Sequence, residues 1–144
     1  AIKQYEQNGY FPEILVLLQA TSPFRNGKHI KEAIRLFDDT CEMVVSVKES
    51  KANPYYTLME EDTNKYLRKS KESDFIRRQD CPKVYELNGA IYIMDIDALK
   101  KNKPNKFTLV RKYVMDEILS HDIDTNLDWV IAEKIIESNY NSKE

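Results

Sequence analysis

Two runs of mainly apolar residues, 14–19 and 43–47, constrain the fold of this chain more than any other feature. Neither run alternates between apolar and polar side chains, a pattern typical of strands that are covered on both faces, as in parallel α/β sheets. Between the runs, apolar residues within 30–37 recur at intervals of three and four, which predicts a helix that packs on the sheet. We therefore expect a β-α-β unit with a right-handed crossover.

Further elements are expected after this unit. Residues 49–82 are polar, contain several tyrosines and are rich in Lys and Glu, which favours an antiparallel excursion from the main sheet. The pattern predicts a third strand of the main sheet at 89–94, a helix at 96–101, and short strands at 107–110 and 113–115.

The last predicted element is an amphipathic helix over 125–138. Its buried face is expected to consist of apolar side chains: Leu127, Trp129, Val130, Ile131 and Ile135. Because strands alternate with helices along the chain, we expect an α/β fold with a mostly parallel sheet.

Length and composition limit the classes of function. With 144 residues, 42% of them hydrophobic and 32% charged, the chain is expected to form about one domain with a sizeable core. The net charge of −2 and the lack of a polybasic run argue against nucleic acid and a membrane surface as partners. No apolar stretch resembles a membrane span or a secretory signal. Cys41 and Cys81 lack metal-ligand spacing and are expected to be reduced thiols, which favours a cytoplasmic protein.

Two carboxylates, Asp122 and Asp124, stand two residues apart just before the last predicted helix. On an extended backbone such side chains leave the same face, so both could bind one hard cation. Mg²⁺ needs only one or two carboxylates when phosphates and water complete its coordination. The alternative is a helix N-terminus, because Thr125 and Asp128 have the spacing of a capping box. The residues alone leave both interpretations open.

Polar residues near the strand ends are the other candidates, because ligands of parallel sheets bind beyond the carboxyl ends of strands. Gln19 closes the first strand, and Asn88 and Tyr92 are expected to share one face of the third. Each has a structural alternative: the Gln19 amide can satisfy loose backbone groups, Asn88 with Gly89 can form a turn or bulge, and Tyr92 can simply pack. Arg78 could bind a carboxylate or phosphate, or be solvated surface.

Three separated segments, 17–25, 88–92 and 122–128, together resemble the acylneuraminate cytidylyltransferases, the CMP-sialic acid synthetase family. They read Leu-Leu-Gln-Ala-Thr-Ser-Pro-Phe-Arg, Asn-Gly-Ala-Ile-Tyr and Asp-Ile-Asp-Thr-Asn-Leu-Asp. The order and spacing of the segments match as well as their content, and the similarity covers nearly the whole chain. The resemblance favours the metal interpretation of the two aspartates over the capping one.

The resemblance implies a Rossmann-like nucleotidyltransferase that joins CTP to a nine-carbon 2-keto acid sugar and releases pyrophosphate. By motif, Asp122 and Asp124 would be the catalytic residues and would hold Mg²⁺ against the triphosphate. The sugar would be contacted by Gln19, Asn88 and Tyr92, and its carboxylate by Arg78. Residues 49–82 look like the family's dimerisation arm, which implies a homodimer.

The chain also departs from the family pattern. It starts downstream of the family's basic Arg-x-x-Ser-Lys loop, and its three glycines form no phosphate-binding loop. We therefore expect residues 1–144 to be a nucleotidyltransferase domain that lacks its N-terminal CTP-binding part and is incomplete and inactive alone. Ala20 replaces the usual Pro, Tyr55 and Tyr56 stand where relatives have Lys, and Phe107 alone represents an aromatic wall, so an altered sugar pocket is expected.

Two other functions remain open at this point. Metal-dependent glycosyltransferases also combine an Asp-x-Asp motif with a nucleotide-binding α/β sheet. A non-catalytic fragment that serves as a dimerisation or sugar-binding module is the third possibility.

Overall fold

The structure, a computed structural model, describes residues 1–141 and contains two compact units. One unit consists of Ala1–Lys48 and the chain from Leu87 onward, and the other is Glu49–Glu86. Within residues 1–141, no helix combines the length and the apolar composition that crossing a bilayer requires.

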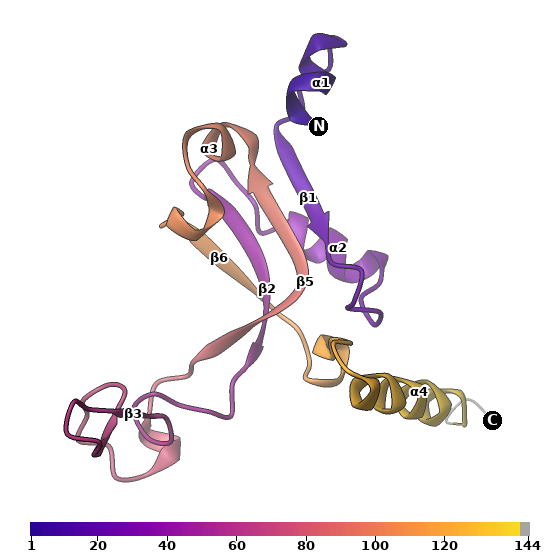
Figure 1. Cartoon of the computed structure of the whole chain (residues 1–144). Helices are drawn as coiled ribbons and strands as arrows, with labels where there is room; N and C mark the ends of the chain where they lie inside the picture. Colours follow the sequence, from indigo (N-terminus) through magenta and orange to yellow (C-terminus); the bar gives the residue numbers. More distant parts are fainter. Residues whose placement is uncertain (142–144) are drawn as a thin grey trace. The chain divides into compact units, whose positions relative to one another are not determined.

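The first unit is built on a four-stranded sheet with the strand order β1-β5-β2-β6 (Figure 1). In that order the strands are β1 (Ile14–Leu18), β5 (Tyr85–Asp95), β2 (Met43–Glu49) and β6 (Val110–Val114). Strand β1 pairs antiparallel with β5, whereas β2 pairs parallel with β6. The Asp95 amide donates to the Glu42 carbonyl at 3.0 Å, and the Ile91 amide reaches Ser46 Oγ at 2.7 Å, so β5 is also antiparallel to β2.

The α/β class is confirmed, but the prediction of a mostly parallel sheet is wrong. Only one neighbouring pair, β2 with β6, is parallel. The physical reason is the connection between β2 and β5. Parallel neighbours need a crossover, usually a helix. The chain leaves β2 and enters β5 through Glu49–Glu86, which contains no α-helix, and β5 returns between β1 and β2 in the opposite direction.

Helices α2 (Gly27–Ile34) and α3 (Ile96–Lys101) of the first unit begin where the sequence provides side-chain caps, whereas α1 (Ile2–Gln7) has none. The unit also contains α4 (Asn126–Asn141) and the 3-10 turns η2 (Pro104–Lys106) and η3 (Ile118–Ser120). At the start of α2, the Asn26 side chain accepts hydrogen bonds from the Lys28 and His29 amides, and His29 Nδ1 accepts one from the Asn26 amide. Asp95 caps α3 by accepting from the Ala98 amide at 2.6 Å. These side chains satisfy amides that a helix start leaves unpaired.

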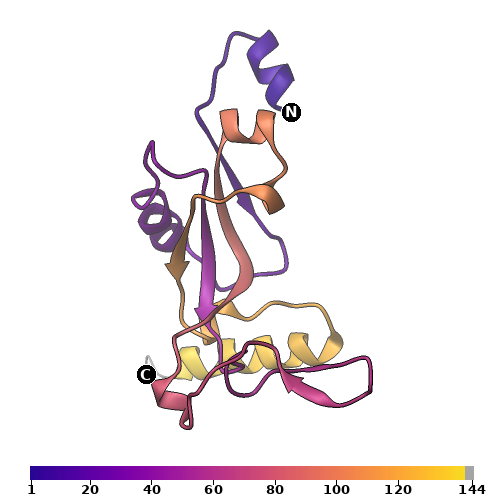
Figure 2. The ribbon, with the colours of Figure 1, turned by 90° about the vertical axis from the view of Figure 1, so that its left-hand side faces the viewer.

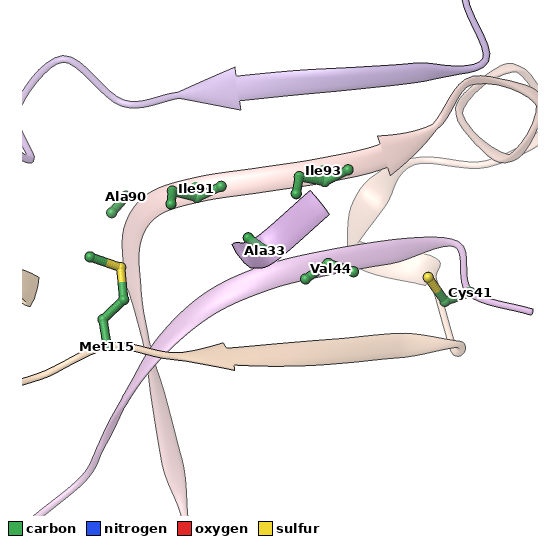
Figure 3. Packing of buried hydrophobic residues seen from close by; sticks show 7 residues of the cluster. All are labelled: Ala33, Cys41, Val44, Ala90, Ile91, Ile93 and Met115. Carbon is green, nitrogen blue, oxygen red and sulfur yellow. The ribbon is translucent and has the colours of Figure 1, made fainter. Parts of the chain in front are cut away.

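Both faces of the sheet carry a hydrophobic cluster. Helix α2 lies beside one face of the sheet (Figure 2). The first cluster lies on that side (Figure 3) and contains Ala33, Cys41, Val44, Ala90, Ile91, Ile93 and Met115. The second, on the α3 side, contains Met43, Val45, Val47, Met94, Ala98 and Phe107. Successive residues of β2 enter opposite clusters, as a strand's alternation requires. Strand β2 is thus buried on both faces, as its apolar run predicts.

Strand β1 has the same kind of sequence but a different environment. It stands at the edge of the sheet, and Val16, Leu17 and Leu18 are 37%, 52% and 38% exposed. The prediction that β1 is covered on both faces is therefore wrong for the described chain. An apolar run shows that a strand can be buried, but its cover must come from other segments.

The predicted buried face of the last helix is also wrong. On α4, Leu127 is 67% exposed and Trp129 57%, and Val130 and Ile131 are exposed as well. Of the predicted residues, Ile135 is half-buried, and the buried Ala132 was not predicted. The apolar spacing predicts a helix correctly but does not by itself supply a surface for the helix to pack against.

The two short strands predicted over 107–115 are one strand, β6. The Glu42 carboxylate accepts hydrogen bonds from the Thr108 and Leu109 amides at 2.7 and 3.0 Å. These amide contacts, the Leu109 one first, lower the pKa of Glu42 below its ordinary value. The side chain of Glu42 therefore accepts hydrogen bonds from backbone amides that would otherwise pair with a neighbouring strand.

The Glu49–Glu86 unit contains the predicted antiparallel pairing. Its strands β3 (Met59–Glu61) and β4 (Leu67–Lys69) form a hairpin, and a 3-10 turn, η1 (Arg78–Asp80), follows. In the hairpin loop the Asp62 carboxylate accepts from the Asn64 and Tyr66 amides, each at 2.9 Å, and from Arg68 Nε at 2.8 Å. An aspartate that binds its own loop amides in this way stabilises a tight turn.

Candidate active site

The candidate site lies where β1 ends and the first half of β5 passes beside it. Leu18 pairs with Ile91, so the residue after β1, Gln19, meets the part of β5 that precedes Ile91. There the Gln19 amide lies against Gly89: a Cβ added to Gly89 would clash with Gln19 Oε1 and stand 3.1 Å from Gln19 Cδ. The antiparallel pairing, rather than aligned carboxyl ends of parallel strands, brings these segments together.

Asn88 is buried beneath this point, with 6% of its surface exposed. Its Oδ1 accepts from Ser46 Oγ at 2.6 Å and from the Ala90 amide at 3.2 Å, and its Nδ2 donates to Ser120 Oγ at 2.8 Å. Ser46 and Ser120 are themselves buried. We call Ser46, Asn88 and Ser120 the polar cluster. It links β2, β5 and η3 by bonds that a low-dielectric interior strengthens.

Asn88 and Tyr92 do not share a face of β5, contrary to the prediction from their even spacing. Tyr92 is half-buried against the second hydrophobic cluster. Asn88 bonds to Ser46, which alternates with Val45 of that cluster and so belongs to the opposite face of β2. Gly89 between them has a φ of +72°, a left-handed backbone that interrupts the alternation of the strand.

Two contacts join the loop after β1 to the segment of the aspartate pair. Ser22 Oγ donates to Asp122 Oδ1 at 3.2 Å, and the Ile123 amide donates to the Thr21 carbonyl at 3.0 Å. Ser22 is buried and Asp122 is half-buried. The structure therefore brings Asp122 beside the loop that begins with Gln19.

The capping box predicted for Thr125 and Asp128 is present. Asp128 Oδ2 accepts from the Thr125 amide at 2.8 Å, from Thr125 Oγ1 at 2.7 Å and from the Asp124 amide at 3.2 Å, while Thr125 Oγ1 accepts from the Asp128 amide at 3.3 Å. The hydroxyl bond from Thr125 is the largest cause that lowers the pKa of Asp128 below its ordinary value. The helix start is thus satisfied without the carboxylates of Asp122 and Asp124.

The aspartate pair has the donor chemistry that Mg²⁺ requires. Among residues 1–141, the exposed Asp124 carboxylate makes no hydrogen bond or ion pair with the protein, and that of Asp122 accepts only the bond from Ser22. No group of three or more His, Cys, Asp or Glu side chains in this described part is arranged to hold a metal by itself. Two hard carboxylates fit a cation that completes its shell with phosphate and water.

Arg25 fixes the backbone of the loop after β1. Its Nη1 donates to the Gln19 carbonyl and, at 2.8 Å, to the Ser22 carbonyl. Within the same loop, Thr21 Oγ1 is buried and has no hydrogen-bond partner in the described part of the chain. The loop backbone is therefore held in place while its side chains keep unused hydrogen-bonding capacity.

Arg78 belongs to the other unit, Glu49–Glu86, and is described within that unit. It is exposed, and its Nη2 donates to the Lys51 carbonyl at 2.8 Å. Ser46 and Ser120, conversely, are structural members of the site region that the sequence analysis did not single out. The one available signal was Ser46, a single polar residue within a buried apolar run.

The fold of the chain is shared with a solved synthase. It resembles 4-diphosphocytidyl-2C-methyl-D-erythritol synthase from Anaerococcus prevotii with a TM-score of 0.60 and 15% sequence identity, over 93% of this chain and 64% of that one. The architecture around the candidate site is therefore that of a known class of α/β proteins.

Sequence comparisons show which proteins are similar to this chain. No family model matches the chain. It is 32% identical over 134 residues to the post-translational flagellin modification protein B of Campylobacter coli. It is 29% identical over 137 residues to the CMP-N,N'-diacetyllegionaminic acid synthase of Legionella pneumophila, and 32% identical over 130 residues to the N-acylneuraminate cytidylyltransferase of Streptococcus agalactiae. These matches cover 92%, 94% and 90% of this chain.

The resemblance to the acylneuraminate cytidylyltransferase family is thereby confirmed: over most of its length the chain is similar in sequence to proteins of that kind. The same alignments cover 57%, 59% and 30% of the three relatives. The chain thus spans less than two thirds of the length of these relatives.

Proposed function

We propose that the protein transfers a cytidylyl group from CTP to a nine-carbon 2-keto acid sugar and releases pyrophosphate. The observation that carries the proposal is the junction of the loop after β1 with the aspartate pair, made by Ser22 with Asp122 and by Thr21 with Ile123. This junction occurs in a chain similar to enzymes that are named for CMP-sugar synthesis.

Asp122 and Asp124 are proposed to be the catalytic residues and to hold Mg²⁺. A bound Mg²⁺ orients the triphosphate and stabilises the negative charge that develops on it. The sugar hydroxyl forms a bond to the α-phosphorus while the bond to the leaving pyrophosphate breaks, and the hydroxyl proton passes to solvent. Asp124 supports this role because its carboxylate has no protein partner within residues 1–141, and Asp122 because only Ser22 occupies it.

The sugar is proposed to contact Gln19, Asn88 and Tyr92, with Arg78 binding its carboxylate. Gln19 is exposed at the end of β1 and can donate and accept hydrogen bonds through one amide. Asn88 is supported less as a direct contact, because its amide is already bonded to Ser46 and Ser120. We propose that it acts mainly by holding β2, β5 and η3 together beside the site.

The Glu49–Glu86 unit is proposed to mediate homodimerisation. Large apolar side chains of this unit are exposed: Tyr66 by 67%, Leu67 by 70% and Ile76 by 86%. Exposed apolar residues of this size are typical of interaction surfaces. The free thiols of Cys41 and Cys81 agree with a cytoplasmic location, where thiols stay reduced.

The test is a pyrophosphate-release assay on the full product of the gene with CTP, Mg²⁺ and either N-acetylneuraminate or N,N'-diacetyllegionaminate. We expect release that depends on both the sugar and the metal. Hydrolysis of a nucleotide sugar without synthesis would instead support a metal-dependent glycosyltransferase. Inactivity in both assays, with sugar binding retained, would support a sugar-binding module.

A further inference from the structure

We propose that Gly89 is a positioning residue for Gln19: the space left by its missing side chain is occupied by the Gln19 amide, which is thereby placed in the candidate site. The inference rests on the proposed function in so far as Gln19 contacts the sugar. The placement itself is a property of this fold and can be tested separately.

The space beside Gly89 is filled. The atoms of Gln19 nearest to an added Cβ are Oε1, within clash distance, then Cδ at 3.1 Å and Nε2 at 3.6 Å. All three belong to the amide group, so even the smallest side chain at position 89 must displace the functional end of Gln19.

The backbone on the β5 side is anchored. Asn88 Oδ1 accepts from the Ala90 amide at 3.2 Å, so one side chain binds the residue after Gly89 as well as the polar cluster. The Ile91 amide donates to Ser46 Oγ at 2.7 Å. Gly89 lies between these fixed points, and its backbone cannot retreat without breaking buried hydrogen bonds.

The backbone on the β1 side is anchored too. Leu18 pairs with Ile91 in the sheet, and Arg25 Nη1 donates to the Gln19 carbonyl. What remains free is the rotation of the exposed Gln19 side chain. An alanine at position 89 is therefore accommodated by a change of the Gln19 rotamer, which removes the amide from its position.

Gly89 also has a left-handed backbone, with φ of +72°, and that alone disfavours alanine. The chain offers a matched control for this effect. Gly9 has a similar φ of +81°, but a Cβ added there meets nothing within 4 Å. Gly9→Ala therefore carries the backbone strain without any displaced side chain.

The experiment compares Gly89→Ala, Gly9→Ala, Gln19→Ala and the double variant Gln19→Ala with Gly89→Ala, all in the full gene product. We expect Gly89→Ala to raise the KM for N-acetylneuraminate about tenfold and to change the KM for CTP by less than about twofold. Gly9→Ala should leave both constants unchanged. The double variant should be no worse than Gln19→Ala alone, because no amide remains to be displaced.

Additive losses in the double variant, or equal increases in both KM values, would overturn the inference. The side-chain amide resonance of Gln19, followed by NMR in wild type and Gly89→Ala, keeps the test independent of turnover. A large shift of that resonance in an inactive protein would support the placement while the proposed function fails. An unshifted resonance would refute the placement whatever the activity.

Discussion

The polar cluster and the aspartate pair are both built from small polar side chains, but the protein uses them in opposite ways. Ser46, Asn88 and Ser120 are buried and bonded to one another. Asp122 and Asp124 lie nearer the surface, and their carboxylates retain oxygen lone pairs that residues 1–141 do not use. The difference separates two tasks: the buried group holds three chain segments together, and the open group is available for a ligand.

The largest expected effect is a loss of turnover on replacing a residue of the aspartate pair. In the full gene product, Asp124→Asn should lower kcat by about 100-fold or more, because the amide loses the charge that holds the metal. The thermal unfolding midpoint should stay unchanged, since the carboxylate makes no hydrogen bond or ion pair with residues 1–141. Pyrophosphate release and thermal unfolding measure the two quantities.

Asp39→Asn serves as the matched control for that variant. Asp39 is an exposed aspartate that lies outside the candidate site, in the loop before the start of β2. Its replacement should leave kcat unchanged. Wild-type turnover by Asp124→Asn would remove the metal assignment.

The next largest effect should be a loss of folding stability on replacing a residue of the polar cluster. Asn88→Ala removes the bonds that the Ser46 hydroxyl, the Ser120 hydroxyl and the Ala90 amide make to Asn88, at a cost of about 2–3 kcal/mol in the free energy of unfolding. Urea denaturation measures this loss. Asn105→Ala, on an exposed residue of η2, should cost almost nothing. Equal stability of both variants would mean that the polar cluster does not hold the segments together.

A smaller effect is expected in the Glu49–Glu86 unit from Arg78, whose side chain is exposed, as that of Asp124 is. Arg78→Ala should raise the KM for the sugar about tenfold with little change in kcat, because a bidentate contact to the carboxylate is lost. Steady-state kinetics at saturating CTP measure the change. The neighbouring Arg77, which forms a surface ion pair with Asp80 at 3.4 Å, provides the control. The same KM in both variants and wild type would assign Arg78 to the solvated surface.

The smallest effect concerns the capping box of Thr125 and Asp128, which follows the aspartate pair in the chain. The pKa of Asp128 is lowered in the folded state, first by its bond from the Thr125 hydroxyl. A lowered pKa stabilises the fold above the ordinary pKa of an aspartate, and this contribution disappears as the pH falls through the folded-state value. Asp128→Asn should therefore unfold at a lower temperature than wild type near neutral pH, with the difference shrinking below about pH 4. A difference that is constant with pH would show that the charge of Asp128 has no part in the cap.

Several features of the fold could be predicted because they depend on residues close together in the chain. The run 43–47 predicts a strand buried on both faces, and β2 is one. The helix at 96–101 and the Thr125–Asp128 capping box follow from local spacing and are present. The three-segment resemblance also came from the sequence, and the relatives confirm it.

Other features depend on contacts that local patterns do not contain. The exposed apolar side chains of β1 and α4 match the pattern for buried residues, but no described segment covers them. The even spacing of Asn88 and Tyr92 predicts one face of a regular strand, whereas the left-handed Gly89 between them places them on opposite faces.

The sequence by itself determined where most helices and strands form and which family its motifs resemble. Only the tertiary structure decided that β5 runs antiparallel between β1 and β2, that the Asn88 side chain bonds to Ser46 and Ser120, and that Gln19 occupies the space beside Gly89. The reason is physical: backbone preference and periodicity act over a few residues, whereas strand direction and the filling of space depend on segments far apart in the chain.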